Sequence, residues 1–392
     1  MRLSQRNAHT TVTAPHSIQD FSAPTVIIDR SKVENNVMAM VQRAQGAGVR
    51  LRPHFKTHQS VEVGEWLRAL GVERITVSSV AMAEGFVEAG WTDLTLALPA
   101  YPAMFGRVAA LLDRAQIGLI VDHPEAAEAL AQSVVLGEAA ERAGRSVPVW
   151  IKLDAGYGRA GVHWQDEDRL RAVVHALDAP WLQRMGLLAH SGHSYAARGR
   201  DQIAAVHAEC LERLLPLRDR YANDFADGRC QLSVGDTPSC SVLDDFGPVD
   251  ELRPGNFVFY DLSQVQIGAC SREQIAASVL CPVIGKDEAR GRLILHGGAV
   301  HLSKDRIEHA DGSFSFGEIA AQPYDGSWQL PDPARRLTSL SQEHGIAHLP
   351  EGALADYRIG DFVQVFPVHS CLACDLHSSY REAGGATLTR VR

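Results

Sequence analysis

The stretch Val-Arg-Leu-Arg-Pro-His-Phe-Lys, residues 49–56, is the first of eight short runs that we predict to be β-strands. A helix-patterned segment, Val61 to Leu70, follows it. The other seven predicted strands are residues 75–79, 93–99, 117–121, 147–154, 185–190, 231–235 and 250–256, and further helix-patterned segments are residues 81–89, 104–115, 124–143 and 204–222. Eight alternations of strand and helix predict an α/β fold, a (β/α)8 TIM-type barrel.

Beyond about residue 271 the pattern changes to strands without intervening helices. The predicted strands are residues 276–284, 291–295, 313–319, 342–348 and 362–368. They indicate a second, mostly antiparallel β-domain. We therefore predict a barrel over residues 25–270 and a β-domain over 271–392, which is completed by residues 1–24 or by the early strand Thr25 to Asp29.

The composition of the chain favours small-molecule chemistry. The 392 residues are 45% hydrophobic and carry a net charge of −9, which offers no broad basic surface for nucleic acid. No apolar run approaches the roughly 20 residues of a membrane-spanning helix. Met1 to Asp20 is polar and lacks a signal-peptide core, so we predict a cytoplasmic protein without membrane partners. Seven cysteines, an odd number in a large chain, indicate reduced thiols.

Lys56 is the first candidate for chemistry. Only five of the 38 basic residues are lysines. Lys56 lies at a strand end, directly after Phe55, and a histidine stands two residues away on each side, His54 and His58. An unprotonated amine in an enclosed site forms a Schiff base with an aldehyde, which a guanidinium cannot do. In proteins that aldehyde is most often pyridoxal phosphate. The alternative is an ordinary surface lysine.

Further polar residues follow the later strands, where a barrel of this type carries its catalytic groups. The glycines, hydroxyls and amides among them suit a phosphate. Taken singly, each glycine is better explained as a turn former. For each histidine a structural role is an equally good explanation, and the alternative for Arg159 is a surface cation. Their convergence on one mouth favours function. These residues are Arg159, His190, His193, Tyr195, Gly235, Thr237, Ser239, Arg253, Gly255, Asn256 and Tyr260.

A second cluster, His-Ser-Cys-Leu-Ala-Cys-Asp-Leu-His, occupies residues 369–377. On an extended backbone His369 and Cys371 face the same way, and imidazole with thiolate suits zinc. Two protein ligands leave positions for water or substrate, as in a catalytic site. The alternatives are a crowded structural site that adds Cys374 and His377, a redox pair of the two cysteines, or no metal at all.

The runs Arg-Pro-His-Phe-Lys-Thr-His at 52–58 and His-Ser-Cys at 369–371 resemble the D-serine dehydratase and D-threonine aldolase family. Those enzymes are fold-type III pyridoxal phosphate enzymes, similar in architecture to alanine racemase. The resemblance extends from about Thr25 to the His369 cluster. In one departure, this chain has His296-Gly297-Gly298 where relatives often carry Asp-Ala-Gly.

The resemblance implies a homodimer and assigns roles to the matching residues. Lys56 would hold pyridoxal phosphate, Arg159 would contact its phenolic oxygen, and His369 with Cys371 would bind a divalent metal, zinc or else manganese. Tyr195 would meet the pyridine nitrogen, with Arg253 as its rival. The phosphate would be held by Gly235, Thr237, Gly255 and Asn256, with Tyr260 as a further hydroxyl donor.

The expected reaction is elimination of water from a D-β-hydroxy amino acid to give a 2-oxo acid and ammonia, with Lys56 as base and the metal as Lewis acid. The nearest alternative is aldol cleavage to glycine and an aldehyde, with His193 or His58 as base. Hydroxyaspartate fits either reaction. Less favoured alternatives are a racemase, with Tyr324 or Tyr357 as second acid/base, and a non-catalytic pyridoxal phosphate carrier.

Overall fold

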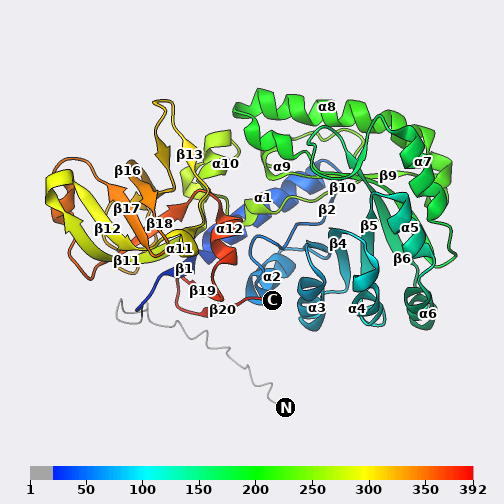
Figure 1. Cartoon of the computed structure of the whole chain (residues 1–392), viewed down its shortest axis with the longest axis horizontal. Coiled ribbons are helices and arrows are strands. Elements are labelled where there is room, and N and C mark those ends of the chain that lie inside the picture. Colours follow the sequence, from blue (N-terminus) through cyan, green and yellow to red (C-terminus); the bar gives the residue numbers. More distant parts are fainter. Residues whose placement is uncertain (1–20, 392) are drawn as a thin grey trace, which may run out of the picture.

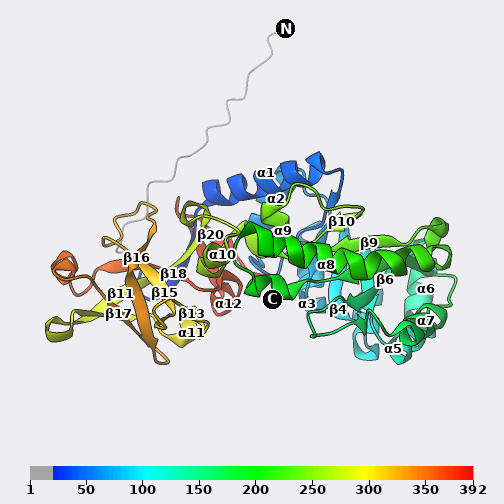
Figure 2. The ribbon, with the colours of Figure 1, turned by 90° about the horizontal axis from the view of Figure 1, so that it is seen from above.

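The computed structural model describes residues 21–391, which form a barrel and a separate β-domain (Figure 1). The predicted polar segment Met1 to Asp20 lies outside the described residues. Helix α1 (Arg30–Gly46) leads from the first strand of the β-domain into the barrel (Figure 2). Within residues 21–391 the helices lack the combination of length and apolar character that a membrane crossing requires.

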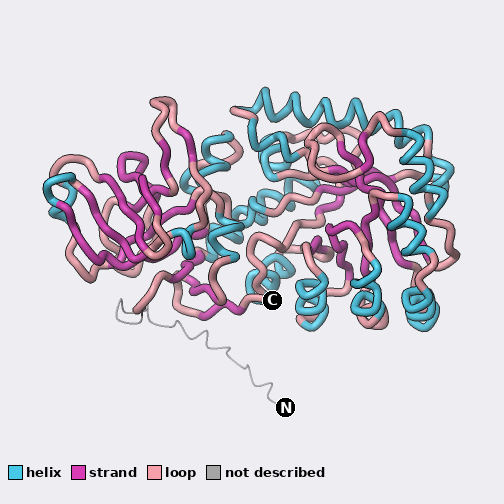
Figure 3. Tube along the Cα trace, viewed as in Figure 1, coloured by secondary structure: helices cyan, strands magenta, loops and turns pink. Residues whose placement is uncertain are grey.

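The barrel contains the eight parallel strands that the sequence predicts, and helices surround them (Figure 3). A parallel bridge between His54 and Thr76 joins the first strand to the second and closes the barrel. The strands are β2 (Arg50–Leu51), β3 (Ile75–Val77), β4 (Asp93–Pro99), β5 (Gln116–Val121), β6 (Val147–Asp154), β8 (Leu182–Ala189), β9 (Gln231–Val234) and β10 (Glu251–Leu252), with β7 (Val162–His163) added to the end of β6.

Most predicted helices are confirmed, and one is divided. The segment 124–143 forms two helices because the Ser133 side chain accepts the N–H of Leu136 and caps a new helix there. Helices α1 and α7 were not predicted, although the buried positions Val33, Val37, Met40 and Ala44 of α1 follow helical spacing. The other barrel helices are α2 (Val61–Ala69), α3 (Val80–Glu88), α4 (Phe105–Ala109), α5 (Pro124–Ala131), α6 (Val134–Ala143), α7 (Glu167–Ala176), α8 (Gly199–Arg220), α9 (Thr237–Val242) and α10 (Leu262–Ile267).

The β-domain is mostly antiparallel, as predicted. Strands β11, β12, β17, β16, β15 and β18 pair in a closed ring, and β1, β19 and β20 extend from β11. The early strand Thr25–Ile28 is β1, and it pairs antiparallel with β11 and parallel with β19. The bounds are β11 (Ala277–Asp287), β12 (Arg292–His296), β13 (Ile307–Glu308), β14 (Phe314–Ser315), β15 (Gly317–Ala320), β16 (Pro331–Leu340), β17 (His344–His348), β18 (Phe362–Pro367), β19 (Ser379–Glu382), β20 (Thr387–Thr389), and helices α11 (Ala299–Leu302) and α12 (Ser370–Asp375).

Strands β16, β19 and β20 were not predicted. Much of β16 has a charged and proline-containing sequence, Pro-Asp-Pro-Ala-Arg-Arg, whose pairing is decided by its neighbours. Because β1 lies in the sheet of the β-domain, the described part of the chain passes from the β-domain into the barrel and returns to the β-domain afterwards. The domain boundaries at residues 25, 270 and 271 stay a prediction.

Candidate active site

A cavity of about 450 Å³ opens at the carboxyl ends of the barrel strands, where helix α12 of the β-domain meets them. Its position is the one at which barrels of this type carry their active sites. The lining residues are His54, Lys56, Ser78, Ala97, Leu98, Pro99, Ile120, Lys152, Tyr157, Arg159, Ala160, Leu188, His190, Tyr195, Asp236, Thr237, Arg253, Gly255, Asn256, His369 and Cys371. Residues more than 300 positions apart in the chain thus share one space.

Most of the predicted site residues meet in this cavity. The ones in its lining are Lys56, Arg159, His190, Tyr195, Thr237, Arg253, Gly255, Asn256, His369 and Cys371. Five others, His58, His193, Gly235, Ser239 and Tyr260, lie outside the described lining. A position at a strand end therefore predicts that residues lie near the cavity, but it does not distinguish side chains that face the cavity from those that face the core.

Lys56 is exposed to the cavity, which differs from the aromatic enclosure that its sequence neighbours suggest. Phe55 points the other way and is fully buried, with its ring centroid 5.0 Å from Phe86 and 5.1 Å from Trp91. Adjacent side chains at the strand end diverge, so Phe55 faces the core while His54 and Lys56 both line the cavity.

His58 is part of the same aromatic cluster beneath the cavity. Its ring centroid is 4.4 Å from that of Phe55, and its Nδ1 accepts the N–H of Ser60 at 3.1 Å. Burial lowers the pKa of His58 to about 3, so the ring is neutral and packed. This placement gives His58 a structural environment rather than access to a ligand.

The sulfur of Cys371 contacts two polar side chains of the barrel. Its Sγ lies 3.2 Å from the Thr57 hydroxyl and 3.6 Å from Nδ2 of Asn256. Asn256 also donates to the carboxylate of Asp261 at 2.6 Å, and the same carboxylate accepts the Ser370 N–H at 2.9 Å. Asp261 is fully buried, so this network fixes the first turn of α12 against the barrel.

His369 occupies the N-cap position of α12, so the two candidate ligands are arranged by a helix start and not by one extended strand. Its Nδ1 lies 3.1 Å from Oδ2 of Asp305, an arrangement typical of metal-binding histidines. Burial opposes charge on this ring, but the bonds to Asp305 and Cys371 outweigh it and raise the pKa of His369 to about 11. Burial likewise opposes a Cys371 thiolate, yet His369 leaves the pKa of Cys371 lowered.

The wider four-ligand arrangement is not formed. Cys374 is buried in the hydrophobic core, where burial raises its pKa. The Nε2 of His377 lies 3.0 Å from the backbone oxygen of His301, away from Cys371. All seven cysteines are free thiols, so residues 371 and 374 do not form a disulfide in this structure.

Arg159 is held on a glycine-rich loop after β6. The Asp154 carboxylate accepts the N–H groups of Gly156 and Gly158, each at 3.0 Å, and folds the loop. Gly161 has φ +121°, and a Cβ there would lie 2.6 Å from the backbone nitrogen of Asp154. The Arg159 guanidinium lies over the Tyr157 ring, 5.0 Å from its centroid, at the rim of the cavity.

Arg253 is fixed in the floor of the cavity. Its guanidinium donates to the Ser233 hydroxyl at 2.7 Å and to the Ala189 carbonyl at 2.6 Å. Burial lowers the pKa of Arg253 to about 10. Tyr195 lies in a different part of the lining, near Thr237 and Cys371, and burial raises its pKa. Tyr195 and Arg253, the two candidates for contact with the pyridine nitrogen, therefore lie in different parts of the lining and are held by different residues.

Among the remaining residues outside the lining, Tyr260 and Gly235 have hydrogen-bond partners, whereas the buried ring nitrogens of His193 and the Ser239 hydroxyl have none of normal geometry. Tyr260 shares a hydrogen bond of 3.0 Å with the Ser241 hydroxyl, and Gly235 accepts from Nδ1 of His190 at 2.7 Å. His193 lies behind Gly156, because a Cβ added to Gly156 would be 3.8 Å from Cε1 of His193. Glycine at 235 is required because a Cβ would approach the Arg253 backbone nitrogen to 2.6 Å.

Sequence reasoning left several cavity residues without a role. These are His54, Lys152, Tyr157 and Asp236, while His190 was singled out only as one of the strand-end residues. Burial lowers the pKa of Lys152 to about 8 and that of His190 to about 3. His54, Tyr157 and Asp236 follow strand ends, and that position is the signal by which they could have been found, whereas Lys152 lies within β6.

The lining fits both groups that the resemblance implies. It offers amines, the guanidinium groups of Arg159 and Arg253, and the buried Thr237 hydroxyl, whose Oγ1 has no partner of normal hydrogen-bond geometry. This set suits an aldehyde that carries a phosphate. Imidazole and thiolate at His369 and Cys371, with Asp305 behind the imidazole, suit a divalent metal.

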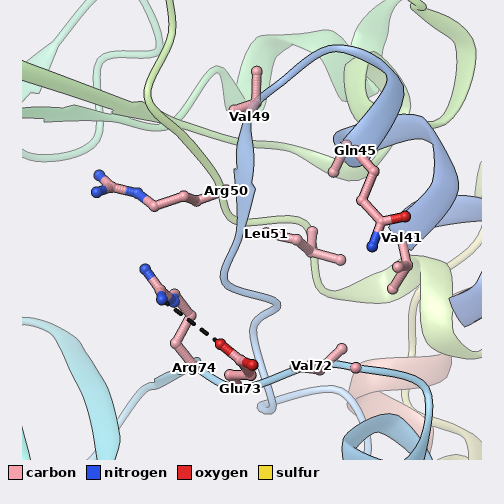
Figure 4. Close-up of a pocket in the computed structure, with 10 residues that line it drawn as sticks. Val41, Gln45, Val49, Arg50, Leu51, Val72, Glu73 and Arg74 are labelled. Atoms are coloured by element: carbon pink, nitrogen blue, oxygen red, sulfur yellow. Dashed lines mark ion pairs between the residues drawn. The ribbon is translucent and has the colours of Figure 1, made fainter.

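A smaller cavity of about 190 Å³ lies at the opposite end of the barrel, between α1 and the start of β2 (Figure 4). Glu73 and Arg74 form a loose ion pair there, with a nitrogen to oxygen distance of 4.0 Å. Val41, Val49 and Val72 supply apolar lining. The amino-terminal face of such barrels serves stability, so we place the chemistry at the other end.

Comparison with known proteins agrees with this geometry. Residues 28–262 match the family described as "Alanine racemase, N-terminal domain", and residues 276–381 match the one described as "Putative serine dehydratase domain". The D-threo-3-hydroxyaspartate dehydratase of Delftia sp. is 33% identical over 89% of this chain and 90% of its own length. Its solved structure superposes with a TM-score of 0.83 at 31% identity, covering 96% of this chain and 99% of that one. A structure of a cysteine-to-alanine mutant of that enzyme is described as the metal-free form.

Two further relatives differ in their named reactions. The D-serine dehydratase of Dictyostelium discoideum is 25% identical, with 93% of both chains covered. The D-threonine aldolase of Arthrobacter sp. is 27% identical over 90% of this chain and 87% of its own length. The chain is therefore a pyridoxal phosphate-dependent lyase of the D-serine dehydratase and D-threonine aldolase family, built on the alanine racemase fold.

Proposed function

We propose that this enzyme eliminates water from a D-β-hydroxy amino acid and releases a 2-oxo acid and ammonia. The observation that carries the proposal is that Lys56 and the His369–Cys371 pair line the same cavity. An amine able to take the Cα proton and ligands for a Lewis acid are therefore available to one small substrate.

Lys56 would hold pyridoxal phosphate, with Thr237, Gly255 and Asn256 around its phosphate and Arg159 at its phenolic oxygen. Bound pyridoxal phosphate supplies an electron sink that makes the Cα proton of an amino acid acidic. Tyr195 and Arg253 are the two candidates for the pyridine nitrogen. The free amine of Lys56 then removes the Cα proton, and its exposure to the cavity supports that role.

His369 and Cys371 would hold a divalent metal, and zinc suits their nitrogen and sulfur donors. A Lewis acid at this position stabilises the charge on a departing hydroxide, which is otherwise a poor leaving group. Asp305 would keep the His369 ring oriented, and Thr57 with Asn256 would orient the Cys371 sulfur.

Elimination is favoured over aldol cleavage by the positions of the histidines. Aldol cleavage needs a base at the substrate hydroxyl, and the candidates for that base, His193 and His58, lie outside the described cavity lining. His54 and His190 line the cavity, but burial holds the pKa of both rings well below that of a free imidazole. They are therefore weak bases at neutral pH.

A racemase and a carrier are less favoured. Tyr357 is fully buried and donates to the Ala320 carbonyl at 3.0 Å, while Tyr324 is 5% exposed and donates to the Gly326 carbonyl at 3.3 Å. Neither phenol is free to act as a second acid/base. A carrier needs no metal ligands in its cavity, so His369 and Cys371 count against it.

The substrate and the assembly are part of this proposal. Lys152, which has no role at the cofactor in this proposal, provides positive charge for a second carboxylate, so D-threo-3-hydroxyaspartate is tested beside D-serine. Leu372 on α12 and Leu376 at its C-cap are 45% and 44% exposed, which supports a homodimer that covers them. The predicted cytoplasmic location is retained.

The test is a product assay with D-serine, D-threonine and D-threo-3-hydroxyaspartate, with added pyridoxal phosphate and zinc. A 2-oxo acid with ammonia is expected, whereas glycine with an aldehyde would establish aldol cleavage. Removing the metal with a chelator should abolish turnover, and zinc should restore it. Full turnover after verified metal removal would contradict the role given to His369 and Cys371.

A further inference from the structure

Three metal-competent side chains meet at one edge of the β-domain, apart from the cavity. They are His296 at the end of β12, His301 on α11, and Glu343 in the turn between β16 and β17. One ligand atom from each lies within 4.8 Å of the other two. The Nε2 atoms of His296 and His301 are 3.5 Å and 3.9 Å from the same Glu343 oxygen, Oε2.

This spacing is close to that of a metal site. Zinc ligands at about 2.0–2.2 Å in tetrahedral geometry are separated from one another by about 3.3–3.6 Å. The distance of 3.5 Å from Nε2 of His296 to Oε2 of Glu343 lies within this range. The distance of 3.9 Å from Nε2 of His301 to the same oxygen exceeds the range by a few tenths of an ångström. The two imidazole planes are perpendicular, with centroids 5.2 Å apart, so the rings approach a shared point without stacking.

The backbone brings the three residues together through the sequence His296-Gly297-Gly298. The Gly297 N–H donates to the Glu343 carbonyl at 2.9 Å. A Cβ at Gly298 would lie 2.2 Å from the Gln342 oxygen, and a Cβ at Gly297 would lie 2.5 Å from the Cys281 sulfur. Both glycines therefore permit the tight passage from β12 to α11 that places His301 over Glu343.

We propose that His296, His301 and Glu343 form a second site for a divalent cation of the zinc class, with water as a further ligand. Two imidazoles and one carboxylate are a donor set that such cations accept. The site does not depend on the proposed reaction.

The second site is linked to the His369 ligand by a short segment. The His301 carbonyl accepts from His377, and Ser303, the C-cap of α11, has the strained backbone conformation φ +67°, ψ −176°. Two residues later, Asp305 contacts His369 at 3.1 Å. A cation on His301 would hold α11 in place and thereby fix the position of Asp305 beside His369.

The test is the zinc content of purified full-length protein after equilibration with excess zinc and removal of weakly held metal. Two equivalents per chain are expected for the parent, and one for His296→Ala and for Glu343→Gln. Cys371→Ala should also retain one equivalent. The control His348→Ala, an exposed histidine on β17, should retain two.

Cobalt substitution identifies which site is filled. Cobalt in Cys371→Ala should show ligand-field bands without thiolate charge-transfer absorption, and the added His296→Ala change should remove those bands. A parent with a single zinc that is lost in Cys371→Ala and kept in both His296→Ala and Glu343→Gln would overturn the second site. That outcome would leave the proposed reaction untouched.

Discussion

The Thr57 hydroxyl lies 3.2 Å from the Sγ of Cys371, although 314 positions separate the two residues in the chain. Thr57 follows Lys56 directly, and Cys371 belongs to the first turn of α12. The contact therefore connects the residue beside the proposed cofactor lysine with a proposed metal ligand from the other domain. Because the groups touch, a change in one domain alters the geometry of the other.

Replacing Thr57 by valine should weaken zinc binding, because it removes the hydroxyl partner of the Cys371 sulfur while keeping the side-chain shape. Loss of a group that orients a ligand typically costs 10–100-fold in metal affinity, and we expect about 10-fold here. Competition with a chromophoric chelator measures the affinity. Thr57→Ser keeps the hydroxyl and should bind nearly as the parent does, so equal affinities for serine and valine variants would contradict the prediction.

Asp305→Asn should also lower zinc affinity, by about 10–100-fold, because the amide no longer provides a carboxylate for Nδ1 of His369. We expect kcat to fall with little change in KM, since the substrate contacts are unchanged. Asp311→Asn is the control, because Asp311 is an exposed carboxylate in the same domain. A fall in KM alone, or an unchanged zinc affinity, would show that Asp305 does not orient the imidazole.

Lys56, and not Lys152, should be the lysine that reacts with pyridoxal phosphate. Both line the cavity, and burial lowers the pKa of Lys152 to about 8, so each is a chemical candidate. Borohydride reduction of the loaded enzyme followed by peptide mapping should place the label on Lys56. Lys56→Ala should lose the label and turnover, whereas a label on Lys152 would reassign the cofactor lysine.

The buried amine of Lys152 predicts a pH-dependent stability difference. Below pH 8 the Lys152 amine is protonated in both the folded and the unfolded chain, so burial of the charged amine lowers the free energy of unfolding by its full amount. Between pH 8 and 10.5 the unfolded state binds more protons than the folded state, and the cost disappears as the pH rises.

Lys152→Met should therefore be more stable than the parent at pH 7, by up to about 3 kcal/mol, since each pKa unit corresponds to 1.36 kcal/mol. The advantage should shrink by pH 10. Urea unfolding of the cofactor-free proteins at both pH values measures it. Lys304→Met, which changes an exposed lysine, should show no such trend, and a constant difference for Lys152→Met would contradict the buried-charge argument.

Arg52→Met should destabilise the barrel strongly. Arg52 is 8% exposed, and its guanidinium contacts Glu251 at 2.8 Å and Asp93 at 2.6 Å across three strands. Removing one partner leaves the buried Glu251 carboxylate without compensation, which costs about 3–5 kcal/mol. Chemical denaturation measures the loss. The double change Arg52→Met with Glu251→Gln should recover part of it, and no recovery would show that packing, not charge, dominates.

The sequence by itself determined the architecture and the region of the site. Eight alternations of apolar strand and amphipathic helix have few solutions other than a closed parallel barrel, because each strand must be covered on its outer face. The same pattern places every strand end at one mouth, which is why Lys56, Arg159 and Arg253 could be assigned to a common cavity. The residue types of the motif at 369–371 likewise predict a metal site, and that prediction stays a proposal.

Only the tertiary structure decided which side chains face that cavity. His58 and Lys56 are two residues apart, yet one is buried among aromatic rings and the other is exposed to the cavity. Lys152, Asp305 and Glu343 acquire their surroundings from segments far away in the chain. Side-chain direction at a strand end and contacts between distant segments depend on packing, and local sequence does not encode packing.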